Sequence, residues 1–432
     1  MDFKTGLICL GCPKNIADLE ALITKIDGLK IVPVEKTDFI ILNTCGFLKS
    51  ARDEVLENLL TFKNKKIILI GCMAGLFKIS DFEKYPQIIA IVSSRYYSDI
   101  GKIFSRAVKG EKIYATGPEP IVFDDLGGKK LLTPKAFSYI KIAEGCNNHC
   151  SYCMIPFLKG RYRSRPMENI VSEIKTLVEA DIKEIILVAQ DCGYYGVDLY
   201  GKKSLTSLLK KIIKISGDFR VRILYVYPER IDEDLLSLIQ KSKKICKYLD
   251  VPLQHGDAKI LKAMNRPYDV SATLKKIEKI RKIVPEISLR TSIIVGFPGE
   301  TKENFENLKK FVKEIKFDLL GAFEYSREPN TAAYSMKNQI SSATKKARRN
   351  ALMKIQQKIS LMKNQALTGK TVRVLIENYD EKAGLYFGRS DHFAPEIDGR
   401  IMVTSLKKLK LNEFHNVKII KGFEYDLLGK VI

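Results

Sequence analysis

Three cysteines lie close together in the segment 144–153, whose sequence is EGCNNHCSYC. Cys146, Cys150 and Cys153 follow the spacing C-x3-C-x2-C, and a loop this tight brings their thiolates together. Three cysteines can hold three irons of a 4Fe-4S cluster and leave the fourth iron open to a chelating substrate. Zinc would need a fourth ligand, and His149 stands between two of the cysteines, where it would hardly reach the same ion. The spacing therefore favours an iron-sulfur cluster over a zinc site.

Three more cysteines are scattered through the first hundred residues, each just after a short apolar run. They are Cys12, Cys45 and Cys72, and the runs cover residues 7–10, 39–42 and 67–70. Parallel strands end at the same edge of a sheet, so thiols that follow three such strands can meet at one place. This arrangement predicts a second 4Fe-4S site with three cysteine ligands. The alternative is that they are three unrelated core thiols.

The other three cysteines carry weaker signals. Cys9 and Cys246 lie within apolar stretches, which predicts core positions for both. Cys192 ends a predicted strand of the central domain, and we expect it to have a polar role without binding metal. The total of nine cysteines is odd, and a reducing cytosol keeps thiols free for metals or catalysis. Metal binding is therefore the leading explanation for the cysteine content.

Composition sets broad limits on the class of protein. The chain has 432 residues, of which 45% are hydrophobic, which is enough for two or three domains with their own cores. It contains no run of about 18 apolar residues and no basic start followed by an apolar stretch. We therefore expect a cytoplasmic protein without a membrane partner. The formal charge of +23 suggests an anionic partner such as RNA or a ribosome, although a lysine-rich composition alone would also produce it.

Two series of short apolar runs alternate with amphipathic stretches, which is the pattern of βα units with a parallel sheet. The first series predicts an N-terminal parallel α/β domain at residues 1–116, and glycines and prolines between 116 and 134 predict a linker. The second predicts a partial (βα)6 barrel within residues 133–365. Its six strands are expected at residues 139–143, 184–189, 221–227, 248–252, 288–295 and 319–325. Active residues should gather at the carboxyl ends of these strands.

The last part of the chain changes character. Residues 341–364 predict one basic helix with Leu352, Ile355, Ile359 and Met362 on an apolar stripe. Its basic residues fit either a solvated face or a face that contacts RNA. After it, short β-rich runs separated by turns predict a small five-stranded antiparallel β-barrel at residues 366–432.

At these residues the sequence resembles the methylthiotransferase branch of the radical S-adenosylmethionine enzymes over essentially its whole length. In that branch a domain with three scattered cysteines precedes a radical core with C-x3-C-x2-C, and a small β-barrel called the TRAM domain follows. Within the branch the chain is most similar to the ribosomal-protein aspartate methylthiotransferases, the RimO family. The stretches that carry this similarity are 10–15 (LGCPKN), 43–47 (NTCGF), 225–228 (YVYP), 252–255 (PLQH) and 394–399 (APEIDG). The chain departs from the family at residues 18–20 (DLE) and in the order Asn148-His149, and neither departure touches a predicted ligand.

The resemblance implies two 4Fe-4S clusters and S-adenosylmethionine as cofactors. The cluster on Cys146, Cys150 and Cys153 would bind S-adenosylmethionine on its open iron and start radical chemistry at an unactivated carbon. The cluster on the three scattered cysteines would carry or supply the sulfur, and a second S-adenosylmethionine would supply the methyl group. A weak carbon-hydrogen acid explains the need for a radical, because no side-chain base is strong enough to remove its proton. No catalytic side chain beyond the cluster ligands is assigned.

The resemblance also implies contacts to S-adenosylmethionine. Tyr152 is placed like the aromatic residue that packs near adenine in this class. Two residues at the end of the second barrel strand are expected near the methionine amino group, and two in the fifth strand near its carboxylate or the ribose. A glycine-rich turn, which could also be a simple turn, resembles the adenine contact. These further residues are Gln190, Asp191, Arg290, Ser292, Gly296 and Gly299.

The sequence leaves two kinds of substrate open, a protein and an RNA. The first reading is an aspartate β-carbon of ribosomal protein number twelve of the small subunit, free or assembled in the ribosome. The alternatives are an adenosine of transfer RNA and, in another class, a non-catalytic iron-sulfur protein that binds RNA. From Gly369 on, the chain has 11 Lys and Arg against 9 Asp and Glu, so Asp391, Glu396 and Asp398 could complement a basic ribosomal protein. An electron donor and a sulfur donor are the further partners expected.

Overall fold

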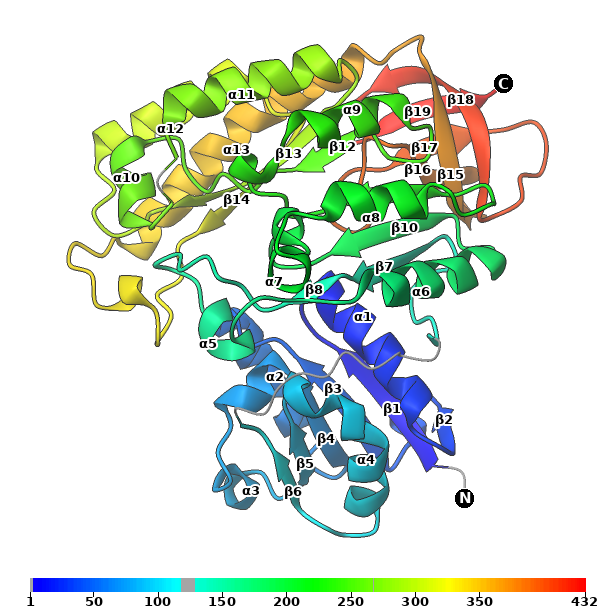
Figure 1. Ribbon diagram of the computed structural model, residues 1–432, viewed down its shortest axis with the longest axis vertical. Coiled ribbons are helices and arrows are strands. Elements are labelled where there is room, and N and C mark those ends of the chain that lie inside the picture. Colours follow the sequence, from blue (N-terminus) through cyan, green and yellow to red (C-terminus); the bar gives the residue numbers. More distant parts are fainter. Residues whose placement is uncertain (1–2, 118–128, 267) are drawn as a thin grey trace.

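The computed structural model describes residues 3–117, 129–266 and 268–432. Three units follow one another along the chain: an N-terminal α/β unit, a central half barrel and a C-terminal β-barrel (Figure 1). The prolines and glycines at residues 118–128, which predict the linker, lie outside the described residues. No helix within the described ranges is long and apolar enough to cross a membrane.

The N-terminal unit is built on one six-stranded sheet with the order β2-β1-β3-β4-β5-β6, in which all neighbours are parallel. Its strands are β1 Phe3–Cys9, β2 Leu29–Ile31, β3 Phe39–Thr44, β4 Lys66–Gly71, β5 Ile88–Val92 and β6 Ile113–Ala115. Its helices are α1 Pro13–Leu22, α2 Lys49–Thr61, α3 Asp81–Lys84 and α4 Ile100–Val108. Strands β3, β4 and β5 are almost wholly buried, as expected where helices cover both faces of a parallel sheet. The three cysteine-bearing runs are the adjacent strands β1, β3 and β4, so their carboxyl ends share one edge.

The central unit is a half barrel made of two parallel sheets, β11-β10-β7 and β12-β13-β14. A parallel bridge between Val221 and Ile245 joins the two sheets. The strands are β7 Phe137–Lys141, β10 Glu184–Val188, β11 Arg220–Ile223, β12 Tyr248–Asp250, β13 Ser288–Val295 and β14 Leu319–Glu324. All six predicted strands are confirmed, although β11 ends at Ile223 because Tyr225 takes a left-handed backbone conformation with φ of 59°.

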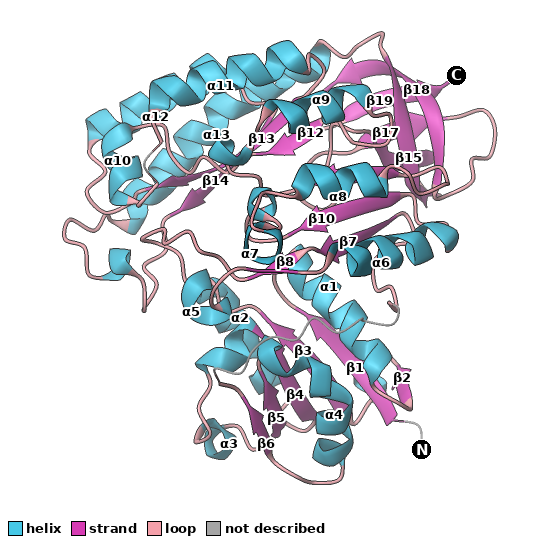
Figure 2. Cartoon of the chain, in the orientation of Figure 1, coloured by secondary structure: helices cyan, strands magenta, loops and turns pink. Residues whose placement is uncertain are grey.

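Helices cover the outer face of the half barrel (Figure 2). They are α6 Met167–Glu179, α7 Val197–Tyr200, α8 Leu205–Ile212, α9 Glu233–Lys241, α10 Ala258–Ala263, α11 Val270–Ile283 and α12 Lys302–Ile315. Cys192 is fully buried in the apolar cluster between these helices and the strands, and Cys246 is 1% exposed, as its apolar surroundings predict. The inner face carries a different cluster, in which Tyr139 and Tyr248 meet Leu375 of the C-terminal barrel.

The helix α13 (Ser342–Gln365) leads into a closed five-stranded barrel with the order β15-β16-β17-β19-β18. Its strands are β15 Thr371–Asp380, β16 Leu385–Arg389, β17 Ile401–Thr404, β18 Glu413–Gly422 and β19 Leu427–Val431. The predicted barrel is confirmed, with one difference: β17 and β19 pair in parallel, whereas the other pairs are antiparallel. On α13, Leu352 and Ile359 are buried, but Met362 is 47% exposed, because the last turn docks through Asn364 instead.

One core expectation is wrong: Cys9 is exposed. Strand β2 pairs with β1 only from Phe3 to Thr5, so the end of β1 has a neighbour on one side alone. The Cys9 thiol lies 3.7 Å from the side-chain amide of Asn43 on that remaining neighbour. A strand end at a sheet edge is open to solvent, which the apolar run around Cys9 does not reveal.

Candidate functional site

The tight cysteine loop follows β8 (Ala143–Glu144), a short strand paired with β9 (Arg163–Ser164) at the carboxyl edge of the half barrel. Cys146 and Cys150 are buried, at 5% and 7% exposure, and Cys153 is half-buried. Backbone N–H groups face two of the sulfurs: that of Asn148 lies 3.4 Å from Cys146 Sγ, and that of Ile155 lies 3.5 Å from Cys153 Sγ. Such N–H groups stabilise thiolates and iron-sulfur clusters. After the loop comes the short helix α5 (Ile155–Lys159).

A buried cation stands beside the same loop. Arg266 is 2% exposed and its Nη1 lies 3.6 Å from Cys150 Sγ. Its guanidinium also lies over the ring of Tyr227, 4.0 Å from the ring centroid, and its Nε has no hydrogen-bond partner in the described structure. Within the described ranges it forms no ion pair with a carboxylate. A buried cation is costly without an anion, so an anionic cluster on the cysteine loop would balance the charge of Arg266.

Burial changes the protonation of the loop thiols. Burial raises the pKa of Cys146 to about 11 and that of Cys153 to about 12 in the metal-free chain. These thiols would keep their protons at neutral pH unless a metal displaces them, because metal ligands must be deprotonated. The donor set of three cysteines, two N–H groups and an arginine fits an anionic 4Fe-4S cluster with one open iron.

The scattered cysteines gather at the carboxyl edge of the N-terminal sheet. Cys12 precedes α1, Cys45 follows β3, and Cys72 opens a 3-10 turn after β4. A Cβ built on Gly11, next to Cys12, would lie 2.7 Å from Cys45 Cβ, so these two loops are in contact. Burial raises the pKa of Cys72 to about 12, and neighbouring Cys12 and Cys45 add to the rise.

No group of three Cys, His, Asp or Glu side chains in the described residues surrounds a single metal ion. A 4Fe-4S cluster does not need such a group, because each cysteine binds a different iron. The two sets of three cysteines therefore stay predictions as cluster ligands. The structure brings the members of each set to one loop or one sheet edge.

Buried charges link the two cysteine sets across the domain boundary. Glu144, two residues before Cys146, accepts from Lys141 at 2.6 Å and lies 3.1 Å from Lys159. Lys141 also pairs with Asp18 of α1 in the N-terminal unit. Burial disfavours the charged form of Glu144, but the two lysines hold its pKa far below the usual range. The sheet edge and the radical loop are thus joined by an ion network rather than by apolar packing alone.

Two of the predicted cofactor contacts, Gln190 and Asp191, follow the carboxyl end of β10. The side-chain Oε1 of Gln190 is buried and has no hydrogen-bond partner in the described structure. Asp191 is fully buried and accepts from the side chain of Asn148 in the cysteine loop at 3.1 Å. Burial raises the pKa of Asp191 to about 6. An unpaired buried acceptor beside the cysteine loop is the feature expected where a polar ligand binds.

The other predicted contacts have differing surroundings. Tyr152 packs against the apolar cluster that contains Phe297, between Gly296 and Gly299. Gly296 has φ of +72°, and a Cβ there would meet the stem of Lys345 at 2.3 Å, so only glycine fits. The N–H of Gly296 donates to Glu300 at 2.5 Å, and that of Gly299 donates to the carbonyl of Asn338 at 2.9 Å. These two N–H groups therefore shape the turn instead of facing a ligand.

Arg290 has protein partners that its strand position does not predict. Its guanidinium contacts Asp250 at 3.1 Å and Asp398 of the C-terminal barrel at 3.2 Å, and it reaches the hydroxyl of Ser292 at 3.4 Å. The charge of Arg290 is therefore balanced within the chain. Its contact with a cofactor carboxylate stays a prediction.

The acids of the barrel loop have partners within the chain. Glu396 accepts from the hydroxyl of Tyr139 at 2.9 Å, Asp398 pairs with Arg290, and Asp391 lies 3.5 Å from Arg220. The reason is that the loop docks against the inner face of the half barrel, where it meets the chain's own arginines and tyrosines. Glu396 is nevertheless exposed and the Asp391 side chain is 36% exposed, so their contact with a basic partner stays a prediction.

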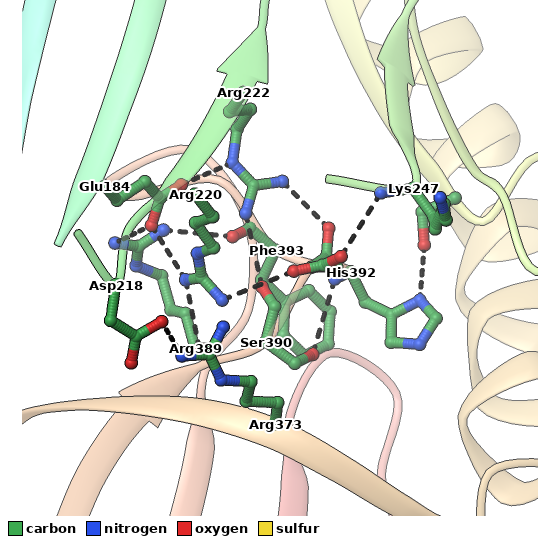
Figure 3. A network of polar contacts seen from close by, with 12 residues as sticks. Glu184, Asp218, Arg220, Arg222, Lys247, Arg373, Arg389, Ser390, His392 and Phe393 are labelled. Atoms are coloured by element: carbon green, nitrogen blue, oxygen red, sulfur yellow. Dashed lines mark hydrogen bonds and ion pairs between the residues drawn. The ribbon is translucent and has the colours of Figure 1, made fainter. Parts of the chain in front are cut away.

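A second inward network holds the barrel in place (Figure 3). Glu184 of β10 contacts Arg220 at 2.7 Å, Arg222 at 2.6 Å and Arg389 of β16 at 2.8 Å. Burial alone would raise the pKa of Glu184, but the three arginines hold it well below its usual range. The C-terminal barrel is thus fixed on the half barrel by buried ion pairs.

Comparison with known proteins matches each unit in turn. The Uncharacterized protein family UPF0004 matches residues 4–93, the Radical SAM superfamily residues 140–312, and the TRAM domain residues 368–432. The protein named "Ribosomal protein uS12 methylthiotransferase RimO" from Acetivibrio thermocellus is 42% identical, with 100% of this chain and 99% of the relative covered. The protein of the same name from Clostridioides difficile is also 42% identical, with 99% of each chain covered. The chain belongs to the RimO family.

RimO-family membership makes the chain a radical S-adenosylmethionine enzyme of the transferase class. Solved structures with little sequence identity share its fold. The methyltransferase TsrM from Kitasatospora setae superposes with a TM-score of 0.55 at 14% identity over 77% of each chain. OxsB, described as a cobalamin-dependent S-adenosylmethionine radical enzyme, superposes with a TM-score of 0.51 at 12% identity, over 82% of this chain and 56% of its own. The fold of this RimO-family chain therefore extends beyond close relatives.

Proposed function

We propose that the chain transfers a methylthio group to the β-carbon of an aspartate in ribosomal protein uS12. The observation that carries the proposal is the presence of two three-cysteine sets in two units whose surroundings are connected by buried ion pairs, in which Lys141 contacts both Glu144 and Asp18. One set suits the generation of a radical, and the other suits the supply of sulfur. The full-length relatives named uS12 methylthiotransferase support the choice of substrate.

Cys146, Cys150 and Cys153 would hold the first 4Fe-4S cluster, and Cys12, Cys45 and Cys72 the second. When bound, the first cluster and S-adenosylmethionine supply the one-electron chemistry that removes hydrogen from an unactivated carbon. The protein's part is to orient the reactants and keep water out.

Side chains around the loop have definable tasks. The unpaired oxygen of Gln190 would accept a hydrogen bond from the methionine part of S-adenosylmethionine, beside the buried carboxyl group of Asp191. Tyr152 and the turn at Gly296 and Gly299 would bound the adenine, with Ser292 close to the ribose. Arg266 would balance the charge of the cluster at Cys150. These contacts would fix the reactive groups of the cofactor relative to the loop.

The partners follow from the substrate. The protein would act in the cytoplasm on uS12, either free or in the small subunit, and would draw on an electron donor and a sulfur donor. Transfer RNA is the alternative substrate, and the overall charge of +23 is the feature that favours it. A non-catalytic iron-sulfur protein that binds RNA is the reading from another class.

The test uses the full chain reconstituted anaerobically with iron and sulfide. It is incubated with S-adenosylmethionine, a reductant and either uS12 or unmodified transfer RNA, and both are examined by mass spectrometry. We expect the methylthio mass gain on the uS12 aspartate, and none from a variant with alanine at Cys12, Cys45 and Cys72 that still cleaves S-adenosylmethionine. A gain on transfer RNA alone would replace the proposed substrate. Failure of the wild-type chain to cleave S-adenosylmethionine would remove the enzymatic proposal.

A further inference from the structure

One arginine touches the loops of both cysteine sets. Arg52 lies in the first turn of α2, seven residues after Cys45. Its Nη1 donates to the carbonyl of Gly46 at 3.1 Å and lies 3.7 Å from the sulfur of Met154. Gly46 follows Cys45 directly, and Met154 follows Cys153 directly. A single guanidinium therefore contacts the residue next to a predicted ligand of each cluster.

The Nη2 nitrogen of Arg52 contacts a glutamate of the central unit. Arg52 Nη2 lies 2.6 Å from Glu328 Oε2, in the loop after β14. The Glu328 side chain is 2% exposed and that of Arg52 is 17% exposed, so the pair is shielded from solvent. Because the guanidinium is planar and its two terminal nitrogens hold different partners, Gly46 and Glu328, it fixes direction as well as distance.

Glu328 also completes the start of α2. The residue before this helix is Leu48, whose side chain cannot accept a hydrogen bond, and no side-chain cap is present there. Glu328 Oε1 instead accepts from the backbone N–H of Lys49 at 2.8 Å. The carboxylate thus caps the helix and faces the positive end of its dipole. The amino end of α2 is therefore held by a residue that lies 279 positions away in the sequence.

We propose that Arg52, held by Glu328, is a positioning residue that sets the separation of the two clusters by fixing the loop after Cys45 against the loop after Cys153. The inference rests on the proposed function, since it needs a second cluster on Cys12, Cys45 and Cys72. Sulfur supplied at one cluster must meet the carbon radical formed at the other. Displacement of reacting groups by about 1 Å can cost roughly 100-fold in rate, even when the change lies far from the chemistry.

The test compares wild-type protein with Arg52→Gln, Arg52→Lys and Glu328→Gln. Arg106→Gln serves as the matched control, because Arg106 pairs with Glu111 at 2.7 Å on the surface of the same unit, far from either loop. Each protein is reconstituted, and its iron content confirms whether two clusters are bound. The magnetic coupling between the two reduced clusters is measured by electron paramagnetic resonance, since dipolar coupling falls with the cube of their separation. The second readout is the ratio of methylthiolated product to cleaved S-adenosylmethionine.

We expect Arg52→Gln to keep both clusters, to change the magnetic coupling and to lower the product ratio by up to about 100-fold. Arg52→Lys should restore part of the ratio, because it returns the charge without the planar fork. Arg106→Gln should match the wild type in both readouts. Should Arg52→Gln fail to bind iron, Glu328→Gln carries the test, because its amide oxygen can still cap α2 while the ion pair is lost.

Two results would overturn the inference, and only the second would also refute the proposed function. Two clusters with unchanged coupling and unchanged product ratio in both Arg52→Gln and Glu328→Gln would refute the positioning role and leave the proposed function intact. A wild-type protein that binds only one cluster would remove the proposed function as well.

Discussion

Arg290 of β13 and Asp398 of the C-terminal barrel form a buried ion pair, with 3.2 Å between Nε and Oδ1. The carboxylate of Asp398 also accepts from the hydroxyl of Tyr248 at 2.7 Å and from the backbone N–H of Ala394 at 2.9 Å. The loop that carries the APEIDG stretch is therefore fixed on the inner face of the half barrel. The TRAM unit is thus docked on the radical core by buried polar contacts near the starts of its strands.

Replacement of Asp398 by asparagine should loosen this closure. The variant keeps an acceptor for Tyr248 but removes the charge that faces Arg290. We expect the free energy of unfolding to fall by about 1.5–3 kcal/mol, the usual worth of a hydrogen bond to a charged group. Chemical denaturation checks this, with Glu381→Gln on an exposed turn as the control. An equal change in both variants would contradict the role given to Asp398.

The depressed pKa of Glu184 predicts how the stability of the same interface changes at acidic pH. The pKa of Glu184 is well below the usual range because Arg220, Arg222 and Arg389 surround it, although burial opposes the shift. A depressed folded pKa contributes stability above the unfolded value of about 4.3, and that stability is lost as pH falls through the folded value. Wild-type stability should therefore fall more steeply below about pH 4 than that of Glu184→Gln.

The same variant should be costly at neutral pH. Glu184→Gln removes a buried anion that three arginines share, although Arg389 keeps Glu377 and Arg220 keeps Asp391. Breaking a buried pair in this way costs about 3–5 kcal/mol. The control is Glu179→Gln, whose side chain is 65% exposed. Thermal unfolding over a pH series measures both effects. Parallel pH profiles for the wild type and Glu184→Gln would show that Glu184 is not the group that titrates.

Local patterns predict most of the fold. Strand β13 coincides with its predicted range, because its β-branched and apolar residues lie between a proline upstream and a Gly-Phe-Pro-Gly turn downstream. The cysteine loop was equally visible, since its ligands lie within eight residues of one another. The gathering of Cys12, Cys45 and Cys72 at one edge follows from sheet topology, which the alternation of strands and helices predicts.

Contacts between distant residues could not be predicted. Arg266 meets Cys150 across 116 positions, and Arg52 meets Glu328 across 276. Nothing in the sequence around any of these residues distinguishes them from ordinary surface charges. Arg290 shows the same limit: its strand was predicted, but one of its two carboxylate partners, Asp398, comes from a loop of another unit. Only the assembled structure reveals which charges are buried together.

Arg266 should set the reduction potential of the radical cluster. A buried positive charge near the Cys150 sulfur stabilises the reduced, more negative form, so Arg266→Met should lower the midpoint potential. A tenfold change in the one-electron equilibrium corresponds to about 59 mV, and we expect a shift of that order. A redox titration followed by electron paramagnetic resonance measures it in a background with alanine at Cys12, Cys45 and Cys72. Arg266→Lys should shift the potential less, and an unmoved potential in Arg266→Met would contradict the assignment.

Removal of the Gln190 side-chain oxygen should affect the stability of the cofactor-free protein and its affinity for S-adenosylmethionine in opposite directions. The buried Oε1 of Gln190 has no hydrogen-bond partner in the described structure. An unpaired buried oxygen lowers the stability of the cofactor-free chain. Gln190→Leu should therefore raise or maintain the thermal midpoint of the cofactor-free protein, yet weaken binding of S-adenosylmethionine. We expect the Kd to rise about tenfold, which corresponds to roughly 1.4 kcal/mol, within the range for a single hydrogen bond.

Equilibrium dialysis of S-adenosylmethionine against the reconstituted protein measures the Kd, and Gln240→Leu on the exposed side of α9 is the control for an added apolar side chain. A purely structural glutamine would lose stability and affinity together when replaced. Gain of stability with loss of affinity is instead the behaviour of a binding residue, because folding and binding make opposite demands on an unpaired buried oxygen. An unchanged Kd in Gln190→Leu would show that this oxygen does not face the cofactor.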